Sequence, residues 1–535
     1  MNYVGTARPI HDAKGKATGY TKYAGDLSLP NMAYLCMLHS KIPHGYVKAV
    51  HAEKALALPG VYGVYHCLNT SDRKYNRYRS NFDQSYLPNE ECAFNDYVRF
   101  VGDKIGVVAA CDQETAERAA RLVEVEYEEL PFSIGFDDTL AGKNCLEGET
   151  PVRDEYTLEV GKKQESTEGL IEVCSTMELP RLHHATMETH ACIADYDPYS
   201  DMLTVYCPNQ AVHGIRTVLA DFLEMPESHV RVVKATMGGS FGAKQEWFLE
   251  PVTALVAKKL CRPVKLVYSR GEAMTDTIVR GAMRMSARGY YTPDGEMKEI
   301  YCDVTLDAGA YIGNAGDYVR ALAGKPTRCY RIPYMHYHGQ VISSNSPVSG
   351  AFRSWSAAEE ALMMERQLDA AAEKLGMDRL AIRLKNVARS GEEDKKLHLS
   401  LEDIRIGDAI TLGSEKFGWD KLKAEDAAFN ASQQRYRRGV GIGIGGHGNT
   451  YFPRFNDYGE GSISLNADGS MQANFTLHDH GCGTVTAMRM IAAEVLKVPE
   501  DKIYMTEGDT AVTPIDYGCF ASRTTYVVGR AVQDA

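Results

Sequence analysis

Hydrophobic and polar positions along the chain follow two periods, which predict strands and helices in mixed order. Apolar runs and alternating patterns predict strands at residues 33–38, 105–110, 123–127, 203–206, 230–235, 263–268, 299–306, 462–465 and 471–477. The helical period predicts helices at residues 114–122, 212–223, 247–260, 357–375, 484–496 and 523–535. Alternating glycines at 439–446 predict a closely packed strand, whereas the polar, turn-rich stretch 144–163 predicts a linker. The fold class is therefore expected to be mixed α/β and α+β.

Length and composition indicate a folded protein of several domains. The 535 residues suffice for roughly three domains of about 150 residues each. The chain is 44% hydrophobic and 24% charged, and it has no run of the about 18 apolar residues that a membrane span needs. A net charge of -12 argues against a general nucleic-acid binder. Because no signal peptide pattern stands at the N-terminus, we expect a cytoplasmic protein without a membrane span.

The cysteines are scattered, which bears on redox chemistry. Thirteen occur singly between Cys36 and Cys519, with no C-x-x-C pair. This pattern fits a reducing compartment better than a disulfide framework. It also argues against a zinc ribbon or a ferredoxin-type cluster, since both need closely grouped thiolates. If the protein does redox chemistry, we expect its iron–sulfur clusters on another chain.

Three turns containing glycine stand between a strand pattern and a helix pattern. They occupy residues 237–245, 478–483 and 516–522. Glycine allows backbone N–H groups to approach a ligand closely, and the N-terminus of a helix favours an anion. The first turn is neither a P-loop nor a dinucleotide fingerprint. A tight turn without a ligand explains any one of them, but three together favour a large anionic cofactor.

Other polar groups are candidates with alternative explanations. His183, His184 and His190 fit neither a helical pair nor a zincin motif, so packing roles are expected. Arg353 and Trp355 precede the predicted helix 357–375 and could hold an anion and a flat ring. A surface arginine and a core tryptophan would explain them equally well.

Several motifs, in collinear order over nearly the whole chain, resemble the molybdenum-binding subunit of xanthine dehydrogenase and aldehyde oxidase. They are Pro208-Asn209-Gln210, Gly238 to Lys244, Ala351-Phe352-Arg353, Met187-Glu188 and Thr513-Pro514 with Phe520-Ala521-Ser522. The early region is similar too, at Gly19 to Asp26, Pro43-His44-Gly45 and Val101 to Pro131. The resemblance implies a hammerhead α/β domain at 1–140. A two-part molybdopterin-binding domain would follow at 141–410 and 411–535, its second part incomplete.

The resemblance also implies a cofactor and the residues around it. The cofactor is molybdopterin, with the cytosine dinucleotide form as one option, and its dithiolene holds molybdenum without direct side-chain ligation. Gln210 matches the glutamine that hydrogen-bonds an oxo ligand of the metal. The implied cofactor-binding residues are Gln210, Gly239, Phe241, Gly242, Arg353, Gly481, Cys482, Gly483, Phe520, Ala521 and Ser522. The implied substrate pocket contains Gln245, Arg320, Trp355 and Tyr451.

The sequence departs from the family pattern at three places. Cys482 replaces the glutamine of a Gly-Gln-Gly turn, and Arg353-Ser354-Trp355-Ser356 replaces Arg-Gly-Phe-Gly. The sequence has no Gly-Glu-Pro motif, whose glutamate is the general base in the family. We therefore expect no catalytic residue in this chain, the base lying on an absent segment or on a partner chain.

The expected function is hydroxylation of an N-heteroaromatic (purine-like or nicotinate-like) or aldehyde substrate, with water as the oxygen source. The resemblance implies a second molybdenum-domain subunit, and a 2Fe-2S subunit and an FAD subunit that carry the electrons away. Gln245 stands where purine-specific members carry glutamate, and an amide carries no charge. Two alternatives stay open: the same fold run reductively as an aromatic dehydroxylase or reductase, and a truncated, non-catalytic scaffold.

Overall fold

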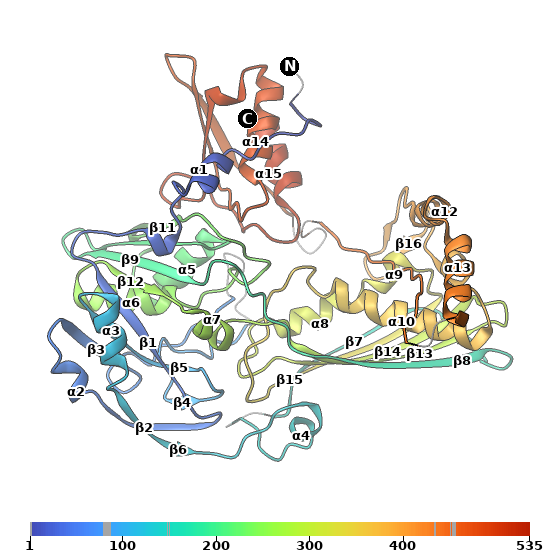
Figure 1. Ribbon diagram of the computed structural model, residues 1–535, viewed down its shortest axis with the longest axis horizontal. Coiled ribbons are helices and arrows are strands. Elements are labelled where there is room, and N and C mark those ends of the chain that lie inside the picture. Colours follow the sequence, from blue (N-terminus) through green and yellow to red (C-terminus); the bar gives the residue numbers. More distant parts are fainter. Residues whose placement is uncertain are drawn as a thin grey trace.

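The computed structural model describes residues 3–78, 87–146, 148, 150–432, 435–449, 451 and 456–535. Three parts are visible in Figure 1: a large sheet with the early strands, a second sheet covered by a long helix, and a C-terminal unit above both. Within the described residues, no helix is long and apolar enough to cross a lipid bilayer.

The first part is built on a seven-stranded sheet with the order β11-β10-β9-β12-β1-β5-β3. Its strands are β1 (Ala33–His39), β3 (Val61–His66), β5 (Lys104–Ala110), β9 (Ala191–Asp197), β10 (Met202–Cys207), β11 (Val230–Lys234) and β12 (Val264–Val267). Strand β1 pairs in parallel with β12, with Ala33 opposite Val264. The sheet therefore continues across the boundary that the sequence predicts near residue 140.

Helices and a small sheet complete this first part. Helix α3 (Gln113–Ala120) packs on β1 and β5, α5 (Val212–Leu223) on β11, and α6 (Glu250–Leu260) on β9. A three-stranded sheet has the order β4-β2-β6, from Tyr97–Val98, Gly45–His51 and Glu124–Glu129. Other short helices, in this part and elsewhere in the chain, are α2 (Glu53–Leu56), α4 (Phe136–Leu140), α7 (Arg270–Asp276), α9 (Pro326–Cys329) and α11 (Arg379–Asn386).

The second part is a five-stranded sheet with the order β7-β15-β14-β13-β8. Its strands are β7 (Val152–Gly161), β8 (Ile171–Leu179), β13 (Ala282–Tyr291), β14 (Met297–Asp307) and β15 (Tyr334–Ile342). Helix α10 (Ala357–Leu375) packs on β8 and β13, and α8 (Ala315–Ala323) on β15 and β7. Apolar side chains of the sheet and of the helices, such as Met285 of β13, Ile300 of β14 and Leu368 of α10, form one buried core.

The C-terminal unit joins strand β11 of the large sheet. It contains β18 (Gly461–Leu465), β19 (Met471–Phe475), β20 (Ile503–Thr506), α14 (Thr484–Leu496) and α15 (Thr524–Asp534). The Arg231 guanidinium makes two hydrogen bonds to Asp509, at 3.0 and 2.6 Å. The N-terminal segment with α1 (Ala13–Thr18) lies beside α14, where the His11 N–H donates to Thr486 Oγ1 at 2.8 Å. The unit is thus anchored over the end of the first sheet.

Three sequence predictions about elements were wrong. The helix predicted from 247 begins at Glu250, with a proline in its first turn, and residues 241–249 form turns and bends. The predicted linker contains the ten-residue strand β7, nine of whose residues pair with β15. The glycine-rich stretch 439–446 forms no strand, since glycine at alternate positions leaves one face without side chains to pack. Gly446 lies instead directly against Cys329.

Other predictions agree closely with the structure. The helices predicted at 212–223, 357–375 and 484–496 are α5, α10 and α14 with the same bounds. The connection between the second part and the C-terminal unit contains α12 (Ile406–Phe417) and α13 (Trp419–Ser432). A small ribbon of β16 (Glu393–Asp394) and β17 (Leu399–Ser400) precedes them.

The packing of α10 gives a direct test of the second core. Leu368 is fully buried, whereas Leu362 of the same helix is 38% exposed. We expect Leu368→Ala to reduce the unfolding free energy by about 2–5 kcal/mol, because it leaves a cavity. Leu362→Ala should cost less than about 1 kcal/mol. Thermal unfolding of the two variants measures the difference, and equal shifts would contradict this description of the core.

Candidate functional site

Gln210 joins the first and third glycine turns. We call residues 238–242 the first corner, 481–483 the second corner and 518–522 the third corner. The Ser240 hydroxyl donates to Gln210 Oε1, and the Gln210 side-chain amide donates to the carbonyl oxygen of Cys519. The Cys519 N–H donates in turn to the Gln210 carbonyl oxygen at 2.9 Å. Segments that are about 280 residues apart in sequence therefore meet at one side chain.

The second corner lies against the third corner and against the start of α5. His480 Nδ1 is 3.8 Å from Cys519 Sγ. The Val212 N–H donates to His478 Nε2 at 3.3 Å, two residues after Gln210. The structure thus joins the first and third corners, and His480, which precedes the second corner, reaches the third. Helices α14 and α15 begin just after the second and third corners, whereas α6 begins eight residues after Gly242.

The backbone is strained at the corners and in the loop of residues 351–356. Fourteen described residues other than glycine have positive φ, and six of them lie in these segments. They are Phe241, Ser354, Trp355, Ser356, Ala521 and Ser522. Such conformations cost of order 1–3 kcal/mol each and persist where the surrounding structure enforces them. Their concentration at the corners is typical of a ligand-binding site.

The loop 351–356 rests directly on the first corner. The Arg353 N–H donates to the Phe241 carbonyl oxygen at 2.8 Å. Gly242 has φ of 101°, and a Cβ there would lie 2.7 Å from the carbonyl oxygen of Ala351. Only glycine therefore fits at position 242 without moving the loop. The Arg353 side chain is exposed, so its cation is available beside the corner.

Two cations hold the same loop from below. Arg280 donates to the Arg353 carbonyl oxygen at 2.7 Å and pairs with Glu359, while Lys325 donates to the Trp355 carbonyl oxygen. The Trp355 ring packs against Tyr318, with ring centroids 4.9 Å apart. The loop is therefore fixed at two carbonyls, one on either side of Ser354.

Lys325 and Glu360 are two buried ionisable groups that act on each other electrostatically, and sequence reasoning missed both. Burial lowers the pKa of Lys325 to about 8 and raises the pKa of Glu360 to about 8. Neither carboxylate oxygen of Glu360 has a hydrogen-bond partner. The one signal in the sequence was the position of Glu360 at the start of an amphipathic helix. Its spacing places it with the apolar residues Ala357 and Met364, on the face that α10 buries.

The histidines of the 183–190 segment have the packing roles that the sequence predicted. His184 Nε2 lies 2.8 Å from the Ala351 carbonyl oxygen, and His190 Nε2 lies 3.0 Å from the Ala243 carbonyl oxygen. Burial lowers the pKa of both to about 3, so both are neutral donors at physiological pH. Across the described part of the chain, no three His, Cys, Asp or Glu side chains form a group able to hold a metal ion.

The second corner differs from the others because a carboxylate of the chain fills it. Asp479 Oδ1 accepts from the Gly481 N–H at 2.8 Å and from the Gly483 N–H at 3.2 Å. Its Oδ2 accepts from the Val485 N–H at 3.2 Å. Burial acts to raise the pKa of Asp479, but these N–H donors outweigh it and lower the pKa. The Cys482 thiol is left exposed at this corner.

The predicted substrate-pocket residues are not all in one place. Trp355 lies beside the first corner, and Gln245 is buried next to Lys244, whose ammonium pairs with Glu188 at 2.5 Å. The Tyr451 ring meets Phe520 of the third corner edge to face, with centroids 5.8 Å apart. Arg320 pairs with Asp154 on β7 at 2.7 Å. Because residues two apart point to different faces of a helix, Arg320 points away from the side where Tyr318 meets Trp355.

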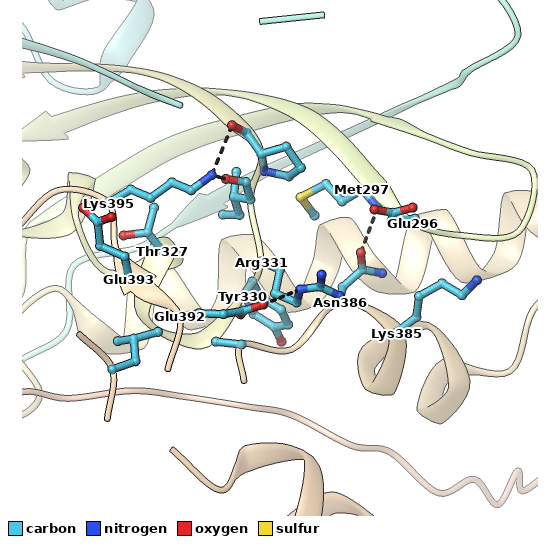
Figure 2. A pocket seen from close by; sticks show the side chains of 14 residues that line it. Glu296, Met297, Thr327, Tyr330, Arg331, Lys385, Asn386, Glu392, Glu393 and Lys395 are labelled. Atoms are coloured by element: carbon cyan, nitrogen blue, oxygen red, sulfur yellow. Dashed lines mark hydrogen bonds and ion pairs between the residues drawn. The ribbon is translucent and has the colours of Figure 1, made fainter. Parts of the chain in front are cut away.

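A separate cavity of about 310 Å³ lies between α9, α11 and the start of β14. Figure 2 shows that its polar groups already have partners: Lys395 bonds two backbone carbonyls, and the Met297 N–H donates to Asn386 at 2.8 Å. Arg331 pairs with Glu392, also at 2.8 Å. The residues that line this cavity include none of the predicted site residues.

Known proteins match the chain over its whole length. A model of the aldehyde oxidase and xanthine dehydrogenase a/b hammerhead domain matches residues 18–131. Models of molybdopterin cofactor-binding domains match residues 149–387 and 412–535. The xanthine dehydrogenase molybdenum-binding subunit of Escherichia coli O157:H7 is 30% identical over 536 residues, which cover 98% of this chain and 70% of the relative. A probable xanthine dehydrogenase subunit of Bacillus subtilis is 31% identical over 541 residues, with coverages of 100% and 70%.

Solved structures agree with these matches. The aldehyde oxidoreductase of Desulfovibrio gigas superposes with a TM-score of 0.88 at 25% identity, over 100% of this chain and 60% of that one. Quinoline 2-oxidoreductase of Pseudomonas putida 86 has the same fold, with a TM-score of 0.90, 23% identity and coverages of 100% and 70%. From its hammerhead domain, its two molybdopterin cofactor-binding domains and these relatives, the chain belongs to the xanthine dehydrogenase and aldehyde oxidase family of molybdenum-binding subunits.

Proposed function

We propose that this chain binds molybdopterin in a multi-subunit oxidoreductase that hydroxylates an N-heteroaromatic or aldehyde substrate, with water as the source of oxygen. The observation that carries the proposal is the meeting of the first and third corners at Gln210, with His480 beside the third corner. Relatives named for xanthine and nicotinate dehydrogenases and for an aldehyde oxidoreductase support this substrate range. No observation favours the reductive alternative or a scaffold without catalysis.

The residues at the corners fit a large anionic cofactor. Left-handed backbone at Phe241, Ala521 and Ser522 turns main-chain groups outward, and Gly242 leaves no side chain between the first corner and the loop 351–356. The exposed guanidinium of Arg353 supplies a cation that suits a phosphate. When bound, the molybdenum cofactor supplies the two-electron redox chemistry. The contribution of this chain is to hold that cofactor and to orient it.

Gln210 has two roles in this proposal. Its amide cross-links the first and third corners. This cross-link supports our assigning to it the role of the family glutamine that faces the metal group. Gly239, Phe241 and Gly242 would contact the cofactor through the main chain, as would Gly481, Cys482, Gly483, Phe520, Ala521 and Ser522. Because Asp479 already occupies the N–H groups of Gly481, Gly483 and Val485, we assign the second corner main-chain van der Waals contacts rather than anion binding.

Trp355 forms the proposed aromatic wall of the substrate pocket. Its ring packs near Tyr318 and Tyr78, with centroid distances of 4.9 and 6.2 Å. Packed aromatic rings offer a flat apolar surface on which a heteroaromatic ring stacks and from which water is excluded. Gln245, buried after the first corner, would meet the polar edge of the substrate through an uncharged amide. Tyr451 would contribute from the side of the third corner.

We extend the proposal to partner chains. One would carry 2Fe-2S clusters and one FAD, because the described residues offer no group of thiolates for a cluster and the relatives are named as subunits. A further molybdenum-domain subunit would supply the carboxylate that acts as general base. The cytosine dinucleotide form of the pterin and a cytoplasmic location belong to the same proposal.

The function is tested on the complex purified from cells that express this chain with its partner chains. We expect molybdenum in the purified complex, and we expect ¹⁸O from labelled water in the product of an N-heteroaromatic or aldehyde substrate. Metal analysis and mass spectrometry measure the two. A complex without molybdenum would refute the proposal. Loss of a hydroxyl group from a phenolic acceptor, without any hydroxylation, would support the reductive alternative instead.

Gly242 gives a test of cofactor binding at the first corner. We expect Gly242→Ala to lower the molybdenum content of the complex at least several-fold, because the new Cβ would displace the loop 351–356. Gly439→Ala is the matched control, since nothing lies within 4 Å of its Cβ position and its φ is not positive. Equal molybdenum contents in the two variants would show that the first corner does not hold the cofactor.

Trp355 gives a test of the substrate pocket. Loss of ring stacking is worth about 0.5–1.5 kcal/mol, so Trp355→Leu should raise KM for a heteroaromatic substrate by up to about tenfold. The molybdenum content should stay unchanged. Trp419→Leu, at a buried tryptophan on α13, controls for a general loss of packing. Steady-state kinetics on both variants decides, and an unchanged KM for Trp355→Leu would remove this residue from the pocket.

A further inference from the structure

The exposed thiol of Cys482 stands at the second corner in a setting that favours its ionisation. Its side chain is hydrogen-bonded to His480, and its Sγ lies 3.0 Å from Thr484 Oγ1. Helix α14, with thirteen residues, begins at Thr484, so the thiol sits beside the positive end of the helix dipole. An imidazole, a hydroxyl and a helix N-terminus together stabilise a thiolate.

A second sulfur faces the same imidazole from the third corner. His480 Nδ1 is 3.8 Å from Cys519 Sγ, and the Thr524 hydroxyl donates to that sulfur at 3.3 Å. Hydrogen bonds to Cys482 and Cys519 raise the pKa of His480 to about 11. The imidazole is therefore held as a cation between two sulfurs from different segments of the chain.

The other charges near Cys482 do not cancel the effect of His480 on its pKa. Burial is the largest single effect and disfavours the thiolate, but the hydrogen bond and charge of His480 and the hydrogen bond of Thr484 together outweigh it and lower the pKa of Cys482 to about 7. Asp479 Oδ1, 3.9 Å from the sulfur, acts in the opposite direction. Its charge is shared with three backbone N–H groups, and Lys16 of α1 and Lys234 of β11 also act on it.

Other cysteines of the chain lack this setting. Burial raises the pKa of Cys36 to about 12 and that of Cys92 to about 11, and it raises the pKa values of Cys67, Cys302 and Cys329 as well. Cys261 is exposed like Cys482, but it caps the C-terminus of α6, at the negative end of a helix. It is therefore a matched internal control for exposure without activation.

We propose that Cys482, paired with His480, is a nucleophilic thiol and a site of covalent modification by soft electrophiles such as hydrogen peroxide. In the reaction with peroxide, the thiolate attacks one oxygen, an S–O bond forms and the O–O bond breaks. The leaving hydroxide takes the proton of the His480 imidazolium and becomes water, so the products are a sulfenic acid, water and neutral histidine. Sulfur is oxidised by two electrons and peroxide is reduced.

Modification of Cys482 would weaken cofactor binding, a consequence that rests on the proposed function. The second corner touches the third corner through His480, so a group added to the sulfur would separate or crowd the two. The reactivity of the thiol does not depend on that consequence. It can be measured on the chain without cofactor, so failure of one idea leaves the other testable.

The test is alkylation of the full chain with iodoacetamide at a series of pH values, with peptide mass spectrometry to follow each cysteine. We expect the rate at Cys482 to reach half its maximum near pH 7. At pH 6 it should exceed the rate at Cys261 by about fivefold, since the larger thiolate fraction outweighs its lower intrinsic nucleophilicity. A rate at Cys482 equal to or below that at Cys261 at pH 6 would overturn the proposal.

A variant separates activation from simple exposure. His480→Gln should slow alkylation of Cys482 at pH 6 and shift its midpoint upward by about one unit or more, while Cys261 reacts as before. Continued protection of the fully buried Cys192 from alkylation shows that the variant is folded. In a parallel experiment, peroxide followed by dimedone should label Cys482 and not the chain with Cys482→Ser. An unshifted midpoint in His480→Gln, or equal labelling in both chains, would refute the role of the pair.

Discussion

The hydrogen bonds of the Gln210 amide are the constraint on which the site depends. A primary amide offers one acceptor and two donor hydrogens, and here the acceptor takes the Ser240 hydroxyl while a donor reaches the Cys519 carbonyl. The Ser240 contact is buried and the Cys519 contact is partly buried. Breaking the buried one would leave a polar group without a partner, at a cost of about 1–3 kcal/mol. This single side chain at the end of β10 therefore fixes the distance between the first and third corners.

Buried charges hold the remaining parts of the site in place. Arg523 is fully buried and donates to Asp457, Asp516 and the Gly518 carbonyl oxygen, which shapes the third corner. Arg280 and Lys325 do the same for the loop that carries Trp355. Charged groups in such positions are stable only when paired, and their donors then reach backbone carbonyls that would otherwise lack partners. The strained backbone at the corners is a consequence of these fixed contacts.

The second corner is built on a different principle. The first and third corners are linked through an amide, whereas the second is filled by Asp479 and meets the third through an imidazole between two sulfurs. The resemblance to the family implies a glutamine at this turn, where this chain has Cys482. The replacement removes a neutral hydrogen-bonding side chain and introduces an ionisable one at the same junction. Cofactor binding and thiol chemistry would thus share one corner.

The sequence by itself determined much of the local structure and the family. Helices α5, α10 and α14 could be predicted to the residue, because their apolar positions recur at the helical period and their ends carry clear signals. The motifs around Gln210 and Gly242 indicated the family, and its molybdopterin cofactor-binding domain models match residues 149–387 and 412–535. Strand β7 was missed because its polar residues face solvent at the edge of its sheet, where only pairing with β15 makes it a strand.

Tertiary structure alone decided which of these residues meet. Arg320 and Tyr318 are close in sequence, yet only Tyr318 reaches Trp355. Lys325, Glu360 and His480 gained their roles from burial and from partners far away in the chain, such as Trp355 and Cys519. Hydrophobic periodicity records which face of an element is buried, but it carries no information about which distant group lies opposite. The pKa of a side chain depends on that group, and so does its function.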